Sequence, residues 1–92
     1  MTTKRQSTAL DERLIADRIR QVLAAMVRAD ASTLTAGMRL FADLGLDSTS
    51  ALDLLMLIEN DLGIRIDADS LEHRHLETIG SLTEYFRQQA GR

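Results

Sequence analysis

A stripe of apolar side chains at helical spacing, bounded by two glycines, constrains this chain more than any other feature. Within the segment 48–62 the stripe consists of Ala51, Leu54, Leu55, Ile58 and Leu62. At about 100° per residue these side chains share one face of an α-helix, which predicts a helix with one buried side. Gly45 and Gly63 flank the segment. Each can adopt the left-handed backbone that a tight turn or a helix end requires.

Further helices are predicted on both sides of this segment. From about Leu10 to Ala29, apolar residues recur at helical spacing, namely Leu14, Ile15, Ile19, Val22, Leu23, Met26 and Val27. The last helix starts near Thr78, and Ser81 and Glu84 have the spacing of a capping box. Its inner face is formed by Ile79, Leu82, Tyr85 and Phe86. Between Asp67 and Glu72 we expect a short third helix or a single turn.

The segment 30–47 shows no persistent period. A connection this long in a small domain is either functional or anchored in the core. The candidate anchors are Leu34, Met38, Leu40, Phe41 and Leu44. Gly37 marks a turn within it. The sequence thus predicts an all-α fold, a small four-helix bundle of three longer helices and one short, with a long loop after the first helix. We expect a tail at 1–7, one domain at 8–90 and a short tail at 91–92.

Composition excludes several classes of protein. The chain has 92 residues, and it contains no cysteine for a disulfide, a thiolate metal site or a cysteine nucleophile. Uninterrupted apolar runs such as 54–58 are far too short to cross a bilayer. The polar N-terminus shows no secretory signal. A soluble, cytoplasmic protein without membrane partners is therefore expected, and we expect it to be a monomer.

Charge is distributed unevenly along the chain. Residues 43–77 carry nine acidic and two basic side chains, a net charge of −7, whereas residues 1–30 carry a net charge of +2. The acidic part predicts partners with an electropositive surface, although an ordinary solvated acidic face is the plainer reading. The same charge, with only three aromatic residues in the chain, argues against nucleic acid as a partner.

Two polar residues precede the central helix. Asp47 and Ser48 are both good N-cap types, because either side chain can accept a hydrogen bond from the first-turn N–H groups. On these two residues alone, capping explains the pattern. A helix N-terminus also favours negative charge, so a phosphate esterified to Ser48 would lie in a compatible field.

The wider pattern adds to this interpretation. The run Phe41-Ala42-Asp43-Leu44-Gly45-Leu46-Asp47-Ser48, followed by a helix ending in Ile58-Glu59-Asn60-Asp61-Leu62-Gly63-Ile64, resembles the acyl and peptidyl carrier protein family. The resemblance implies that Ser48, beside Asp47, bears a covalent 4′-phosphopantetheine arm. The family usually has leucine after this serine, where this chain has Thr49. The run after Ser48 is more similar to freestanding carriers from specialised-metabolite pathways than to fatty-acid carriers.

The central helix also carries a candidate docking surface. Leu52 and Met56 lie off the core stripe, and either they contact the long loop or they form an apolar patch edged by carboxylates. The residues expected to contact partners are Leu46, Thr49, Leu52, Asp53, Met56 and Glu59. The implied partners are a phosphopantetheinyl transferase, a loading enzyme (an adenylating enzyme or an acyltransferase), and downstream synthase, condensing or tailoring enzymes.

No metal site is predicted. Asp67 opens a stretch like a calcium-binding loop, but Glu72 occupies the position that needs glycine and Thr78 the position that needs glutamate. His73 and His75 lie two residues apart without a well-spaced third ligand, so a solvated loop pair is the better interpretation.

Nor is an active site predicted. No Gly-x-Ser-x-Gly elbow and no glycine-rich phosphate loop is present, and a helical chain of 92 residues offers little room for a substrate pocket. The leading hypothesis is therefore a non-catalytic carrier that holds an acyl or aminoacyl group as a thioester on the arm. The alternative is a helical adaptor that uses the Leu52 and Met56 face without modification.

Overall fold

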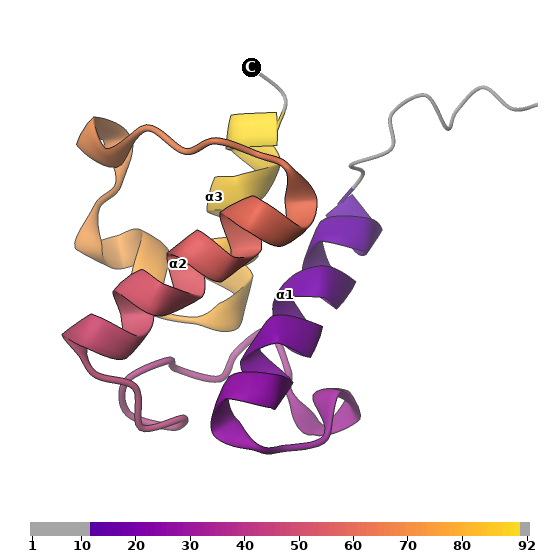
Figure 1. Cartoon of the computed structure of the whole chain (residues 1–92). Coiled ribbons are helices and arrows are strands. Elements are labelled where there is room, and N and C mark those ends of the chain that lie inside the picture. Colours follow the sequence, from indigo (N-terminus) through magenta and orange to yellow (C-terminus); the bar gives the residue numbers. More distant parts are fainter. Residues whose placement is uncertain (1–11, 91–92) are drawn as a thin grey trace, which may run out of the picture.

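The computed structural model describes residues 12–90, which form three α-helices joined by connections that contain short 3-10 turns (Figure 1). The α-helices are α1 (Glu12–Val27), α2 (Ser48–Leu62) and α3 (Ile79–Ala90). The 3-10 turns are η2 (Ala31–Thr33), η3 (Ala68–Ser70) and η4 (His73–Leu76). Over this range the only β-type pairing is an isolated bridge between Arg39 and Thr78. The expected tails, 1–7 and 91–92, lie outside the described residues.

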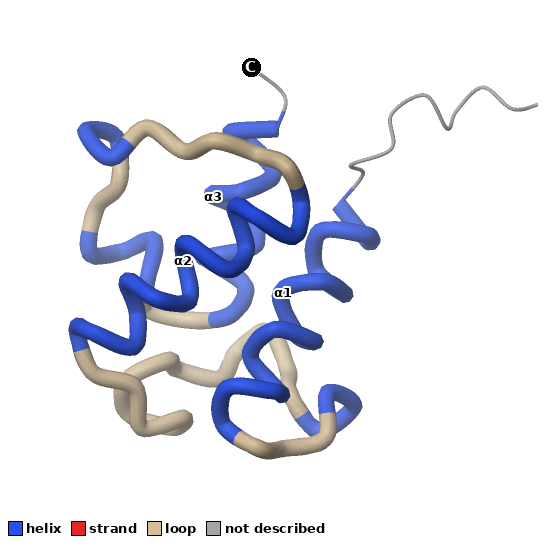
Figure 2. The backbone as a smooth tube through the Cα atoms, in the orientation of Figure 1, coloured by secondary structure: helices blue, strands red, loops and turns tan. Residues whose placement is uncertain are grey.

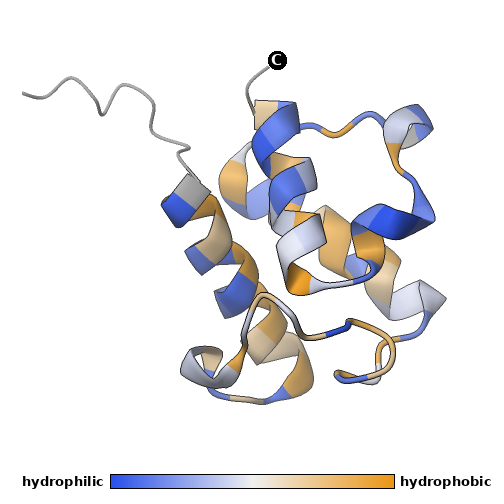
Figure 3. Cartoon of the chain, turned by 180° about the vertical axis from the view of Figure 1, so that it is seen from behind, coloured by the Kyte–Doolittle hydropathy of each residue, from blue (hydrophilic) through white to orange (hydrophobic). Residues whose placement is uncertain are grey.

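The core lies where α1 packs against both α2 and α3. Each helix is coloured in alternating apolar and hydrophilic patches in Figure 3, as expected for helices with one buried side. The predicted stripe of α2 is confirmed, because its buried residues are Ala51, Leu54, Leu55, Ile58 and Leu62. The inner face predicted for α3 is confirmed, because Ile79, Leu82, Tyr85 and Phe86 are all buried. The face predicted for α1 is confirmed in part: Ile15, Ile19 and Leu23 are buried, whereas Leu14, Val22, Met26 and Val27 are half-buried.

The connection between α1 and α2 is held against α3 by backbone hydrogen bonds. Figure 2 shows it largely as loop, at the end of the bundle where α2 begins. Leu40 N–H donates to Glu77 O at 3.0 Å, Ile79 N–H to Met38 O at 3.0 Å, and Gly80 N–H to Ala36 O at 2.9 Å. The predicted anchors are confirmed, because Leu34 and Leu40 are buried and Met38, Phe41 and Leu44 pack partly buried against the core.

Gly80 lets the connection approach α3 closely. A Cβ atom at this position would lie 3.1 Å from the carbonyl oxygen of Ala36, which is tighter than an ordinary contact. The missing side chain therefore allows the backbone hydrogen bond between these two residues. Gly37 lies in the turn predicted for it.

The count of four helices is not confirmed. Where a short third helix or a single turn was expected over 67–72, the chain forms the single turn η3, and η4 follows after Leu71 and Glu72. Asp67 accepts the N–H of Asp69 at 3.0 Å, and this local bond favours a single turn. The long loop is also not wholly irregular, because Asp30 caps η2 by accepting the N–H of Ser32 at 3.0 Å.

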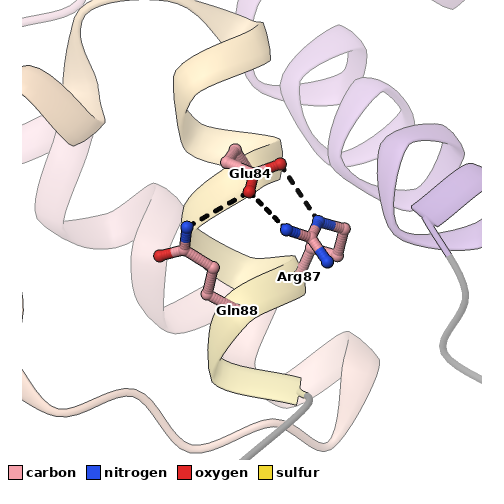
Figure 4. A network of polar contacts seen from close by, with 3 residues as sticks. All are labelled: Glu84, Arg87 and Gln88. Atoms are coloured by element: carbon pink, nitrogen blue, oxygen red, sulfur yellow. Dashed lines mark hydrogen bonds and ion pairs between the residues drawn. The ribbon is translucent and has the colours of Figure 1, made fainter.

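The predicted capping box of α3 is wrong by one turn. Thr78 Oγ1 accepts the N–H of Ser81 at 3.0 Å, and Ser81 Oγ accepts the N–H of Thr78 at 3.0 Å. Ser81 is therefore the inner member of the box rather than its cap. Glu84 instead binds Arg87 and Gln88 on the exposed side of α3 (Figure 4).

Two helix ends use left-handed backbone. Gly63 follows α2 with φ of 68°, as predicted. After α1 the same conformation is taken by Arg28, with φ of 59°, and Ala29 N–H donates to Ala24 O at 2.9 Å. Among the helices of residues 12–90, none combines the length and the apolar character needed to span a membrane.

Candidate functional site

The turn before α2 is closed by its own backbone. Gly45 has φ of 74°, in the left-handed region that the sequence predicted for it. Its N–H donates to Phe41 O at 3.1 Å, and the next N–H, that of Leu46, donates to Leu40 O at 3.1 Å. Because Leu40 is itself bound to the segment before α3, the turn is tied to the rest of the bundle.

Asp47 is the N-cap of α2. Its Oδ1 accepts the N–H of Ser50 at 2.8 Å, and its carbonyl oxygen accepts the N–H of Ala51 at 2.9 Å. The hydrogen bond from the Ser50 N–H lowers the pKa of the Asp47 carboxyl below its ordinary value. Asp47 therefore stays ionised at neutral pH and fixes where the helix starts.

Ser48 occupies the first position of α2 and is exposed. Within the described part of the chain its hydroxyl makes no hydrogen bond, because capping is done by Asp47. The hydroxyl is therefore free to be modified. It lies at the end of the helix where unpaired N–H groups and the dipole favour an anion.

An exposed apolar surface follows Ser48 along α2. The side chains of Leu52 and Met56 are 60% and 65% exposed. The alternative that they pack against the long loop is therefore wrong. Thr49 and Asp53, also expected at the docking surface, are exposed on the same helix. We call Leu52, Met56, Thr49 and Asp53 the docking face, after the partner contacts that the sequence predicts for them.

Two residues expected at this face have other positions. Leu46 is only 8% exposed, because its hydrogen bond to Leu40 folds the turn inward and its side chain joins the core. Glu59 is half-buried, and its Oε2 accepts the N–H of Ile66 at 2.9 Å. The structure therefore gives Leu46 a packing role, and it gives Glu59 a role in holding the segment after α2.

Sequence reasoning missed Leu57, which is 48% exposed on α2. It lines a surface groove between α1 and α2 together with Val22, Ala25, Met26, Asn60 and Asp61. Asp61, at this groove, forms an ion pair with Arg18 of α1 at 3.1 Å. The available signal was the position of Leu57, which is apolar but lies off the core stripe.

A second groove lies at the C-terminal end of α2. It is lined by Met56, Leu57, Glu59, Asn60, Gly63, Ile64 and Arg65. Met56 thus belongs both to the docking face and to this groove, which we call the α2 end groove.

The two histidines do not form a pair. His73 is exposed, and its ring stacks on Phe41 with 6.1 Å between the centroids. His75 is half-buried against Tyr85 at 4.5 Å, and its Nδ1 accepts the N–H of Glu72 at 2.8 Å. The expectation of a solvated pair is therefore wrong for His75, which has a structural role.

Comparison with known proteins gives one consistent result. Residues 17–86 match the family model described as "Phosphopantetheine attachment site", a range that contains the Ser48 turn and the whole of α2. Among curated proteins the chain is similar to the acyl carrier protein of Saccharopolyspora erythraea, with 35% identity over 82% of this chain and 77% of that protein.

Further relatives are spread over distant bacteria. The acyl carrier protein of Onion yellows phytoplasma is 37% identical over 78% of this chain and 92% of its own length. That of Thermotoga maritima is 29% identical over 84% of this chain and 93% of its own length. The similarity therefore covers nearly the full length of these two proteins.

Proposed function

Because this chain belongs to the acyl carrier protein family and accordingly carries a covalent 4′-phosphopantetheine group, we propose that Ser48 is the residue to which the group is attached. The observation that supports this most is the exposed, unbonded hydroxyl at the first position of α2, next to the Asp47 cap. We further propose that the chain holds an acyl group as a thioester and presents it to successive enzymes. The thiol of the group supplies the thioester chemistry that a cysteine-free chain lacks.

The residues around Ser48 fit a phosphodiester. The start of α2 offers backbone N–H groups and the positive end of the helix dipole, both of which stabilise a phosphate. Asp47 stabilises this end of the helix, because its carboxylate accepts a hydrogen bond from the backbone N–H of Ser50. The ionised carboxylate also lies next to the attachment residue, where it can bind a divalent ion or a basic residue of the transferase.

The docking face supports transient recognition by several enzymes in turn. Leu52 and Met56 supply exposed apolar anchors, and Asp53 adds negative charge beside them. Such a combination gives weak contacts whose formation is accelerated by a basic partner surface. We propose the phosphopantetheinyl transferase, the loading enzyme and the downstream synthase, condensing or tailoring enzymes as the partners.

For the cargo, the names of the relatives favour an acyl over an aminoacyl group, since they are acyl carrier proteins. Both an acyltransferase and an adenylating enzyme can load an acyl group, so both stay candidates for the loading enzyme. The specialised-metabolite pathway suggested by the residues after Ser48 stays a prediction. Loading assays with acyl and aminoacyl donors, read out by mass spectrometry, would test which class of cargo and which loading enzyme the protein accepts.

The deciding experiment is intact mass spectrometry after co-expression with a phosphopantetheinyl transferase. The wild-type protein should gain the mass of one arm, and Ser48→Ala should gain none. Ser50→Ala is the matched control, because it removes a neighbouring hydroxyl and should still be modified. An unmodified wild-type protein would support the adaptor hypothesis instead, whereas an arm on Ser48→Ala would show that another residue is the attachment site.

A further inference from the structure

The turn before α2 folds back onto residues 39–41. The N–H groups of residues 43–46 donate to carbonyl oxygens of that segment at 3.0–3.1 Å. Residues 39–41 are in turn joined to the segment before α3 by the bridge between Arg39 and Thr78. The stretch of chain that leads to Ser48 is therefore connected to the bundle through this turn.

One side chain also takes part in closing the turn. Asp43 Oδ2 accepts the backbone N–H of Arg39 at 2.8 Å, while the N–H of Asp43 donates to Arg39 O at 3.0 Å. The two residues therefore bind each other in both directions. Between residues 39 and 46 of the described chain, no other side chain forms a hydrogen bond. Because hydrogen bonds with an ionised acceptor are stronger than neutral ones, Asp43 contributes more to closing the turn than any single backbone bond there.

The ion pair between the same two side chains contributes little. Arg39 Nε lies 3.9 Å from Asp43 Oδ2, and the two side chains are 67% and 43% exposed. Water screens an exposed pair of this kind, and ordering two side chains opposes it. The hydrogen bond to the backbone N–H is therefore the contact through which Asp43 acts on the turn.

Ser48 depends on this turn because it lies in the first turn of α2. The N–H groups there lack intrahelical partners, and helix ends fray. Asp47 restrains this end from within the helix by accepting the Ser50 N–H. The closed turn restrains it from outside, since it fixes Leu46 through the bond from its N–H to Leu40 O. The two restraints together determine where the Ser48 hydroxyl lies relative to the rest of the bundle.

We propose that Asp43 is a positioning residue for attachment of the arm: its carboxylate closes the turn that presents the Ser48 hydroxyl to the phosphopantetheinyl transferase. This inference rests on the proposed function. Asp43 itself forms and breaks no bond in the transfer. Without its carboxylate the turn is closed in only part of the molecules, and a transferase that recognises the closed form meets less of its substrate. KM then rises in inverse proportion to the closed fraction, while kcat is unchanged.

The test compares three variants of the unmodified protein with wild type, using a phosphopantetheinyl transferase and coenzyme A. Asp43→Ala removes the acceptor, whereas Asp43→Asn removes the charge but keeps an acceptor oxygen. Asp67→Ala is the matched control, because Asp67 is also exposed and accepts a backbone N–H, that of Asp69 at 3.0 Å, but lies in the connection after α2. Each variant loses one negative charge, so the net charge is the same in all three.

We expect Asp43→Ala to raise KM roughly 3- to 10-fold with little change in kcat, and the other two variants to stay within about twofold of wild type. Hydrogen exchange measures the turn directly. The amides of Gly45 and Leu46 should exchange about tenfold faster in Asp43→Ala, the change expected from the loss of one hydrogen bond. The amide of Leu82, in α3, should be unaffected.

An unchanged KM for Asp43→Ala would overturn the inference. So would an equal defect in Asp43→Asn, which would mean that the charge itself contacts the transferase, or in Asp67→Ala, which would reflect general destabilisation. Unfolding of Asp43→Ala, checked by circular dichroism, would overturn it as well, because the bond would then support the fold as a whole. A wild-type protein that gains no arm, or gains it at a residue other than Ser48, would instead overturn the proposed function, whatever the variants show in hydrogen exchange.

Discussion

The carboxylate of Glu59 accepts the backbone N–H of Ile66 at 2.9 Å, across the left-handed turn at Gly63 that ends α2. This bond directs the chain back along the helix it has just left. It also satisfies an N–H group that is partly shielded from water, which would otherwise be costly. The position of Glu59 on the helix predicts a surface charge, but its carboxylate stabilises the turn after α2.

Glu59→Ala should lower the free energy of unfolding by about 1–2 kcal/mol, because it removes a hydrogen bond to a charged acceptor. Glu59→Gln keeps an acceptor oxygen in the same place and should lose less. Urea denaturation of the three proteins measures the difference. If the alanine and glutamine variants were equally stable, the bond to Ile66 would contribute nothing.

Asp47→Asn should slow modification by the transferase more than it destabilises the fold. Asparagine is also a good N-cap, so the bond to the Ser50 N–H can be retained, whereas the negative charge beside Ser48 is lost. Single-turnover modification kinetics and thermal melts provide the two measurements. Normal kinetics together with a lowered melting temperature would assign Asp47 a purely structural role.

The difference in stability between wild type and Asp47→Asn should depend on pH. The Ser50 N–H lowers the pKa of Asp47 from an ordinary 3.8. A carboxyl whose pKa is lower in the folded state stabilises the protein above its unfolded pKa, and this stabilisation is lost as pH falls through the folded pKa. The wild-type protein should therefore lose its advantage in melting temperature over Asp47→Asn as the pH falls through the folded-state pKa of Asp47. A difference that stays constant down to about pH 3 would contradict the linkage.

Ile58 and Met56 separate folding from recognition within one helix. Ile58 is fully buried. Ile58→Asp would place an unpaired carboxylate in the core and leave space unfilled, at a cost of several kcal/mol that is comparable with the stability of a domain this small. Circular dichroism should show a protein that is largely unfolded at room temperature.

Met56→Arg should behave in the opposite way. Its side chain is 65% exposed, so melting should stay within about 0.5 kcal/mol of wild type. Transfer of the cargo from a partner enzyme should slow, because an apolar anchor is lost and the local negative field is weakened. Unfolding of Met56→Arg, or unchanged rates with every partner tested, would show that the docking face lies elsewhere.

Arg28 holds a backbone conformation that glycine adopts more easily. Its φ of 59° lies in the left-handed region, where a side chain costs about 1 kcal/mol or more. Arg28→Gly should therefore raise the free energy of unfolding by about 0.5–1 kcal/mol. Arg28→Ala removes the same side chain but keeps the strain, so it serves as the control in thermal or urea melts. Equal stability of the two variants would mean that the strain is not the cause.

Much of this protein follows from local sequence alone. The helical period places Leu54 and Ile58 on the core face and Leu52 and Met56 on a different face, because neighbours on a helix are set by geometry without reference to the rest of the fold. That this second face is exposed rather than covered by the long loop is decided by the tertiary structure. The turn at Gly45 and the caps at Asp47 and Gly63 are local as well, since each depends on residues within a few positions.

What the sequence alone could not decide depends on segments that are distant along the chain. Leu46 is buried because its N–H donates to the carbonyl oxygen of Leu40. The N–H of Leu40 in turn donates to the carbonyl oxygen of Glu77. The backbone of Arg39 pairs with Thr78 directly before α3. The capping box is therefore formed by Thr78 and Ser81 rather than by Ser81 and Glu84 as predicted.

The groove at the end of α2 arises in the same way. Residues 63–66 turn back over the helix, so that Arg65 comes to line the groove with Met56. Helical periodicity describes only neighbours within one element. The position of a side chain that is buried, bonded or brought to a groove by another segment is decided by tertiary packing.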